Sequence, residues 1–171
     1  LRIRDEVFWR IEEFLRERDF TRTDTPIFQP TSCEDTTELY EVDHFGNAAY
    51  ITQSGQLYLE ALEHSLGRVY DFGPVFRAEK SKTRKHLNEF WMMDWEAIFH
   101  DQQDAETLLE EMLKYVLKNV LENRTVELNI LERDTTALER AVAEPFPRIK
   151  LRDMIKILNE EHGFELSPED D

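Results

Sequence analysis

The sequence has little cysteine, glycine or proline. Of its 171 residues, one is cysteine, five are glycine and six are proline. A single thiol, Cys33, excludes an internal disulfide framework and fits a reducing compartment. No apolar run approaches the ~20 residues that cross a bilayer, and no charged-then-apolar leader opens the chain. We therefore expect one cytoplasmic domain with a single core and no membrane partner.

Cations are also scarce, except in one short segment. The chain carries 37 acidic and 21 basic residues, for a formal net charge of -16. Residues 77–86 nevertheless read R-A-E-K-S-K-T-R-K-H, with five lysines or arginines and one carboxylate. A concentrated basic loop in an acidic chain indicates an anion site, and a polyphosphate or a nucleic-acid backbone is its natural ligand. A solvated hairpin tip is the alternative interpretation.

Hydrophobic periodicity predicts both helices and strands. Apolar residues at helical spacing mark a first helix from Ile3 to Leu15, and Asp104 is the expected N-cap of a long later helix. A hairpin should flank the basic loop, because an apolar run ends at Phe76 before it and another extends to about Phe99 after it. The remaining expected elements are strands over 20–24, 48–52 and 68–72 and helices over 57–66 and about 151–161. Antiparallel strands flanked by helices predict an α+β fold.

Three segments, in order, carry a family resemblance. F-R-A-E at 76–79 and H-L-N-E-F at 86–90, on either side of the basic loop, resemble the second signature motif of class II aminoacyl-tRNA synthetases. The similarity is to the branch that holds the aspartyl and asparaginyl enzymes. Upstream, T-P at 25–26 resembles the end of the first motif, and Q-S-G-Q-L-Y at 53–58 resembles the amino-acid-binding segment. A lone F-R-x-E would carry little weight, whereas three matches in order are specific.

The resemblance implies a domain organisation. Residues 1–171 would form the front part of a class II catalytic domain, with its antiparallel sheet and flanking helices. The first motif would span about 3–30, the amino-acid segment 51–60 and the second motif about 75–99. A third, glycine-rich motif with its arginine has no counterpart among the five glycines, and no anticodon-binding domain precedes Leu1. We expect the chain to be a piece of a longer enzyme.

The resemblance assigns the nucleotide site to the hairpin. Arg77 would contact both the α-phosphate of ATP and the amino-acid carboxylate, as the catalytic residue. Glu79 would face the adenine edge, His86 the terminal phosphates and Phe90 the adenine ring. An aromatic face suits a base and a guanidinium suits a phosphate, so the residue types fit these roles. The other loop cations are expected to contact the tRNA acceptor end: Lys80, Lys82, Arg84 and Lys85. The Mg²⁺ that accompanies ATP would find its ligands in the missing part of the domain, and no metal site is expected here.

The resemblance also assigns an amino-acid site. Glu34 and Gln56 would hold the ammonium and backbone of any amino acid, so they do not discriminate. The aspartyl branch carries a lysine three residues after Gln56, where this chain has Leu59. Burying the carboxylate of aspartate beside a leucine is costly, whereas the amide of asparagine needs only a donor and an acceptor. Asp94 would accept from that amide, although an aspartate there is equally like the aspartyl branch, and Asp35 stands where the family has glycine.

The expected function is therefore that of an aminoacyl-tRNA ligase. The longer enzyme would activate asparagine with ATP and transfer it to tRNA, while the segment alone would be inactive. The resemblance also implies a homodimer, with an interface formed by the helix from Ile3 to Leu15 and the strand that ends at Pro26. The alternatives are an aspartyl enzyme, a relative that synthesises asparagine from aspartate, and a noncatalytic nucleotide-binding paralogue.

Overall fold

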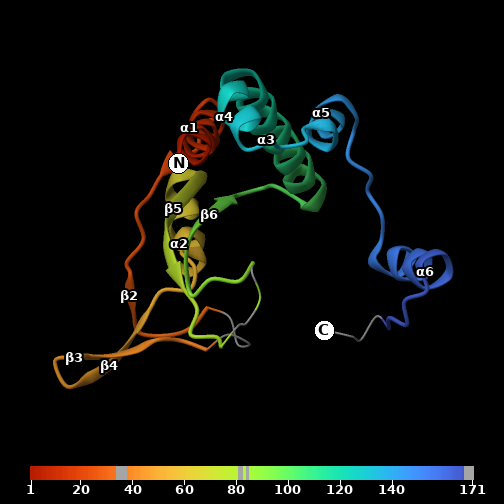
Figure 1. Cartoon of the computed structure of the whole chain (residues 1–171). Coiled ribbons are helices and arrows are strands. Elements are labelled where there is room, and N and C mark those ends of the chain that lie inside the picture. Colours follow the sequence, from red (N-terminus) through yellow and green to blue (C-terminus); the bar gives the residue numbers. More distant parts are fainter. Residues whose placement is uncertain (34–37, 81–82, 84, 168–171) are drawn as a thin grey trace.

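Helices and strands are mixed along the chain in the computed structural model, which describes residues 1–33, 38–80, 83 and 85–167. The helices are α1 (Arg2–Arg16), α2 (Gln56–Leu66), α3 (Gln102–Asn123), α4 (Thr125–Ile130), α5 (Thr136–Ala143) and α6 (Leu151–His162). The strands are β1 (Thr21–Arg22), β2 (Phe28–Gln29), β3 (Glu41–His44), β4 (Asn47–Ile51), β5 (Arg68–Phe76) and β6 (Glu89–Ala97). In Figure 1, α1, α3 and α4 lie together at the top of the view, above β5 and β6. The predicted α+β class is confirmed.

A long hairpin, formed by β5 and β6, is the centre of the fold (Figure 1). The strands pair antiparallel along their whole length, with Arg68 opposite Ala97 at the end far from the loop. The predicted hairpin is thus confirmed, and the strand expected over 68–72 is the first half of β5. The second arm ends at Ala97 rather than near Phe99, because Phe99 has a φ of 59°, which is left-handed and incompatible with a strand.

The hairpin is joined by a short third strand, β1, which pairs with β5 in parallel. The sheet β1–β5–β6 is therefore mixed rather than purely antiparallel. The strand expected over 20–24 is only Thr21–Arg22. A second sheet, of order β2–β4–β3, is antiparallel, and its strand β4 confirms the expectation over 48–52. Its other strands, β2 and β3, were not expected from the sequence.

The core lies between the hairpin and the helices α1 and α3. Phe14 and Leu15 of α1 are buried, and they cluster with Tyr70 and Phe72 of β5 and with Val116 of α3. The apolar stripe of the first helix is thus largely core, which fits its helical spacing. Side chains alternate between the two faces of a strand. Asp71 and Gly73 therefore face away from α1 and α3.

The start of α3 differs from the sequence expectation. Asp101, not Asp104, is the N-cap, and its side chain accepts hydrogen bonds from the backbone N–H groups of Gln103 (2.8 Å) and Asp104 (3.0 Å). Asp104 accepts the Asp101 N–H in return at 3.1 Å. The two aspartates form a reciprocal capping box. Asp104, at the third helical position, resembles an N-cap in sequence, which explains the difference from the expected start.

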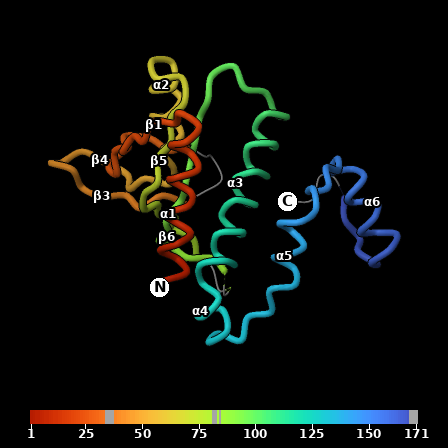
Figure 2. The backbone as a smooth tube through the Cα atoms, turned by 90° about the horizontal axis from the view of Figure 1, so that it is seen from above, coloured from red at the N-terminus to blue at the C-terminus, as the bar shows by residue number. Residues whose placement is uncertain are grey.

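The hairpin face opposite α1 and α3 is covered by α2, which packs against both β5 and β6. The last helix, α6, stands apart from the rest and is joined through an extended segment after α5 (Figures 1 and 2). It confirms the helix expected over about 151–161, whereas α5 was not expected. In the part of the chain that the structure describes, no helix is long and apolar enough to cross a membrane.

Candidate active site

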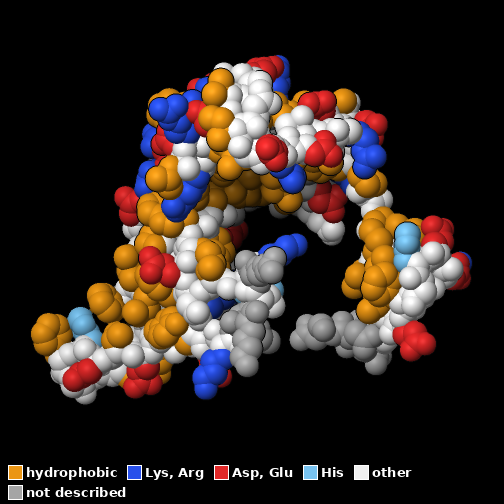
Figure 3. All heavy atoms as spheres, viewed as in Figure 1, with side chains coloured by type: hydrophobic (Ala, Val, Ile, Leu, Met, Phe, Trp, Pro, Cys, Tyr) orange, Lys and Arg blue, Asp and Glu red, His pale blue; other side chains and the backbone are white. Residues whose placement is uncertain are grey.

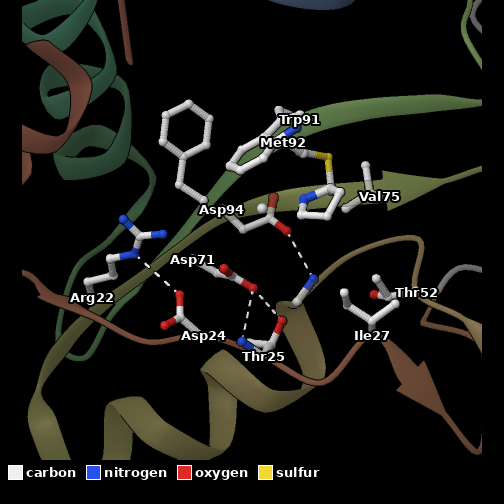
Figure 4. A pocket seen from close by; sticks show the side chains of 14 residues that line it. Arg22, Asp24, Thr25, Ile27, Thr52, Asp71, Val75, Trp91, Met92 and Asp94 are labelled. Carbon is white, nitrogen blue, oxygen red and sulfur yellow. Dashed lines mark hydrogen bonds and ion pairs between the residues drawn. The ribbon is translucent and has the colours of Figure 1, made fainter. Parts of the chain in front are cut away.

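A cavity of about 220 Å³ lies on the hairpin face that α2 covers (Figure 4). Its walls combine β5 and β6 with the segment after β1 and with the start of α2. Its lining includes Thr25, Thr52, Gly55, Asp71 and Asp94. Two of the three sequence segments that carry the resemblance, the first motif and the amino-acid segment, therefore meet the hairpin at this cavity.

Asp71 holds the end of the first motif against β5. Its Oδ2 accepts a hydrogen bond from the Thr25 hydroxyl and a longer one, at 3.4 Å, from the Thr25 backbone N–H. Burial raises the pKa of the Asp71 carboxyl above its ordinary value, and the bonds from Thr25 oppose this rise. Asp71 was not among the predicted site residues, although a charged residue within the apolar run V-Y-D-F indicates a specific partner.

Asp94 holds the start of α2 from the neighbouring strand. Its Oδ2 accepts from the Ser54 hydroxyl at 2.8 Å and from the Gly55 N–H at 3.2 Å. The same Ser54 hydroxyl accepts from the N–H of Gln56 at 3.1 Å. Two residues that the sequence analysis assigned to the amino acid, Asp94 and Gln56, are thus linked through one serine. Gln56 is exposed, and its side-chain amide donates to Glu60 at 3.0 Å.

The cavity face is rich in carboxylates. Asp71 and Asp94 are directly paired across β5 and β6, and Glu96 follows Asp94 on the same face. Burial raises the pKa of Glu96, and the negative charges of Glu63, Glu60 and Asp94 raise it further. Such a face attracts an ammonium group. Among the described residues, no group of three His, Cys, Asp or Glu side chains is placed to hold a metal ion.

The loop end of the hairpin, where β5 ends and β6 begins, brings together two of the predicted nucleotide-binding residues. The guanidinium carbon of Arg77 lies 5.7 Å from the centroid of the Phe90 ring, so a cation stands over an aromatic face. The backbone around Arg77 is fixed by Asn88, whose carbonyl accepts the Arg77 N–H at 3.0 Å. The Asn88 side chain donates to the carbonyls of both Arg77 and Glu79 at 2.7 Å. Glu79, the third predicted ligand, is therefore held close to Arg77 through its backbone.

The basic loop is only partly described. His86 is exposed, and its ring nitrogen Nδ1 bonds the Thr83 hydroxyl, which also accepts the His86 N–H at 3.2 Å. Lys80 and Lys85 are exposed, as an anion-binding loop requires. Glu34, Lys82 and Arg84 were also predicted as site residues, and they lie outside the described residues.

Leu59 is buried and does not line the cavity. Its side chain is completely buried in α2, against the sheet, and it is not among the residues that line the cavity. It therefore adds no charge to the cavity lining. Its place in choosing asparagine over aspartate stays a prediction.

The family comparison agrees with this geometry. Residues 1–169 match the family model described as tRNA synthetases class II (D, K and N). The chain belongs to this family of class II tRNA synthetases.

The chain is similar to proteins named asparagine–tRNA ligase. One, from Pelotomaculum thermopropionicum, is 53% identical over 93% of this chain and 37% of that protein. Another, from Streptococcus agalactiae, is 48% identical over 96% of this chain and 37% of that protein. The chain thus spans little more than a third of the length of these relatives.

Solved structures lead to the same branch. The asparaginyl-tRNA synthetase of Pyrococcus horikoshii complexed with asparaginyl-adenylate superposes with a TM-score of 0.94 and 34% identity, over 99% of this chain and 39% of that one. The corresponding Entamoeba histolytica complex gives a TM-score of 0.83 and 27% identity, over 100% of this chain and 38% of that one.

Proposed function

We propose that the full-length protein is an asparagine–tRNA ligase, which joins asparagine to AMP and transfers it to tRNA. The observation that carries the proposal is that Phe90 and Asp94 lie on the same face of β6, four residues apart. At the rise of a strand this separation is about 13 Å, enough to seat a base, a phosphate and an amino acid in a row. The relatives named asparagine–tRNA ligase support asparagine as the amino acid that is activated.

Each end of this row suits one part of the reaction. The adenine ring would stack on Phe90. Arg77, whose guanidinium lies over the Phe90 ring, would donate to the α-phosphate. The substrate ammonium would lie toward the carboxylate face around Asp94 and Gln56. The substrate carboxylate then attacks the α-phosphate, a new oxygen–phosphorus bond forms, and pyrophosphate leaves. Arg77 stabilises the extra negative charge because its donors are already in place.

ATP binding by this class involves Mg²⁺, which neutralises phosphate charge. The described residues do not offer a set of ligands for it, so no step above depends on a metal held by this part of the chain. The other roles in the proposal concern the whole protein. The exposed Lys80 and Lys85 would contact tRNA phosphates together with Lys82 and Arg84, Glu34 would contact the amino acid, and a homodimer in the cytoplasm would be the working form.

The test is amino-acid-dependent exchange of pyrophosphate into ATP, measured on the full-length protein. We expect exchange with asparagine and little with aspartate. Exchange that depends on aspartate instead would identify an aspartyl enzyme. A folded protein that binds ATP and supports no exchange with either amino acid would identify a noncatalytic paralogue. Ammonia-dependent formation of free asparagine from aspartate would identify the synthetase-like alternative.

A further inference from the structure

A buried glutamine behind the cavity has three oxygen atoms around its amide nitrogen. Gln29, at the end of β2, is 3% exposed. Its Nε2 lies 2.7 Å from the Thr52 hydroxyl, 3.1 Å from the Pro26 carbonyl and 3.3 Å from the Ser54 carbonyl. Thr52 in turn donates its hydroxyl to the Ser54 carbonyl at 2.9 Å. The position of Gln29 Nε2 therefore requires a hydrogen-bond donor. A glutamate of the same size would place a carboxylate oxygen against three oxygen atoms that act as acceptors.

The Ser54 carbonyl belongs to the same peptide unit as the Gly55 N–H. A trans peptide is planar, so the direction of its carbonyl fixes the direction of its N–H. Gln29 and Thr52 both donate to the Ser54 carbonyl, while Asp94 accepts the Gly55 N–H at 3.2 Å. The peptide is therefore fixed between a buried amide and a carboxylate of the cavity.

This arrangement connects Gln29 to the amino-acid end of the site without direct contact. Gln29 is not among the residues that line the cavity, whereas Asp94 and Gly55 are. If the Ser54–Gly55 peptide rotates, Asp94 loses one of its two donors. The start of α2 at Gln56 is then also less fixed, because the Gln56 N–H donates to the Ser54 hydroxyl, which itself donates to Asp94.

We propose that Gln29 is a positioning residue for the amino acid, acting through the Ser54–Gly55 peptide on Asp94 and Gln56. This inference rests on the proposed function for its substrate, asparagine. It concerns ATP less, because Phe90, the residue proposed to stack on the base, lies four residues from Asp94 along β6, about 13 Å away. A defect at Gln29 should consequently affect the KM for asparagine and spare the KM for ATP.

The first experiment compares Gln29→Met with wild type in the full-length protein. Methionine has a similar length but offers no donor, so we expect the KM for asparagine to rise about tenfold and the KM for ATP to change less than about twofold. Gln103→Met is the matched control, because Gln103 is exposed on α3 and should leave both values unchanged. A folded Gln29→Met variant with an unchanged KM for asparagine, or with equal rises in both KM values, would overturn the proposal.

A second pair of variants keeps the test decisive if Gln29→Met does not fold. Thr52→Val removes the hydroxyl that lies between Gln29 and Ser54 and should reproduce the selective rise in KM for asparagine. Thr52→Ser retains the hydroxyl and should stay near wild type. In the double variant Gln29→Met/Thr52→Val the two effects should not add, because both act on one carbonyl. Full additivity, or equal behaviour of the valine and serine variants, would count against this route.

Hydrogen exchange separates this proposal from the proposed function. Amides 55–59 should exchange faster in Gln29→Met and Thr52→Val than in wild type and Gln103→Met. That result needs no enzymatic activity. If wild type shows no asparagine-dependent exchange of pyrophosphate, the proposed function fails, and the amide data still decide whether Gln29 fixes the peptide. Unchanged protection at 55–59 would overturn the positioning role.

Discussion

Asp71 and Asp94 are direct cross-strand partners in the β5–β6 hairpin, and each carboxylate holds a different segment of the chain. Asp71 accepts from Thr25, at the end of the first motif, while Asp94 accepts from Ser54 and Gly55, at the start of α2. Like charges directly opposite each other destabilise a strand pair. Here the pair is retained because both carboxylates are hydrogen-bonded, and together they join three distant segments around one cavity.

The raised pKa of Asp71 predicts a pH-dependent cost. A carboxyl with a higher pKa in the folded state binds its proton more tightly there, so stability falls as the pH rises from the ordinary pKa through the raised one. Asp71→Asn can still accept from Thr25 but carries no charge. We expect it to be more stable than wild type at pH 7, with the difference shrinking toward pH 4. Thermal unfolding across this range measures it.

An exposed carboxylate provides the control for Asp71→Asn. Asp5→Asn lies on the exposed side of α1 and should show no such convergence. If Asp71→Asn is less stable than wild type at neutral pH, the charged form of Asp71 is the favourable one, and the bonds from Thr25 outweigh the effect of burial.

Gly55 is packed too tightly to accept a side chain. A Cβ atom at this position would lie 2.8 Å from both Asp71 Oδ2 and Thr25 Oγ1, and these atoms hold each other in place. We expect Gly55→Ala to lower the free energy of unfolding by about 1–3 kcal/mol, as overpacking does. Gly73→Ala is the matched control, since its Cβ would come no closer than 3.5 Å to a neighbour. Denaturant unfolding of both variants compares them, and equal costs would contradict the contact geometry.

Arg77 and the loop lysines should separate two steps of the reaction. Arg77→Ala removes the donor over Phe90, and we expect asparagine-dependent pyrophosphate exchange to lose on the order of 3 kcal/mol of transition-state stabilisation with little change in folding. Lys85→Ala removes an exposed loop charge and should leave exchange intact while slowing transfer to tRNA. Wild-type exchange by Arg77→Ala would remove Arg77 from the mechanism.

The sequence predicted the hairpin better than the cavity. Arg77 and Phe90 flank a basic loop between two apolar runs, and this local pattern predicts both the turn and the exposed cations. Gln29 gave no such signal, because two of its three partners, Thr52 and Ser54, lie more than twenty residues away and its burial depends on the pairing of β2 with β4. Long-range strand pairing is set by packing of the whole domain, so the parallel β1–β5 contact was equally out of reach.

The last prediction concerns a buried charge that joins α1 to the end of α3. Glu6 is 4% exposed and accepts from Arg10 at 2.8 Å and from the Asn123 amide at 3.0 Å, while Arg124 lies 2.5 Å from its other oxygen. The hydrogen bond from Arg10 is the main cause that lowers the pKa of Glu6, against the effect of burial. Its contribution to stability is therefore full above the ordinary pKa of a glutamate and is lost as the pH falls through the lowered one.

Glu6→Gln should consequently destabilise the fold at neutral pH. It leaves Arg10 and Arg124, whose side chains are 21% and 28% exposed, without their shared carboxylate. We expect a loss of about 2–3 kcal/mol, near the lower end for a broken buried pair because both arginines keep some contact with water. Denaturant unfolding at pH 7 measures this loss, and Asp5→Asn, one residue away and exposed, should cost almost nothing. Equal stabilities of the two variants would show that the Glu6 cluster does not hold α1 to α3.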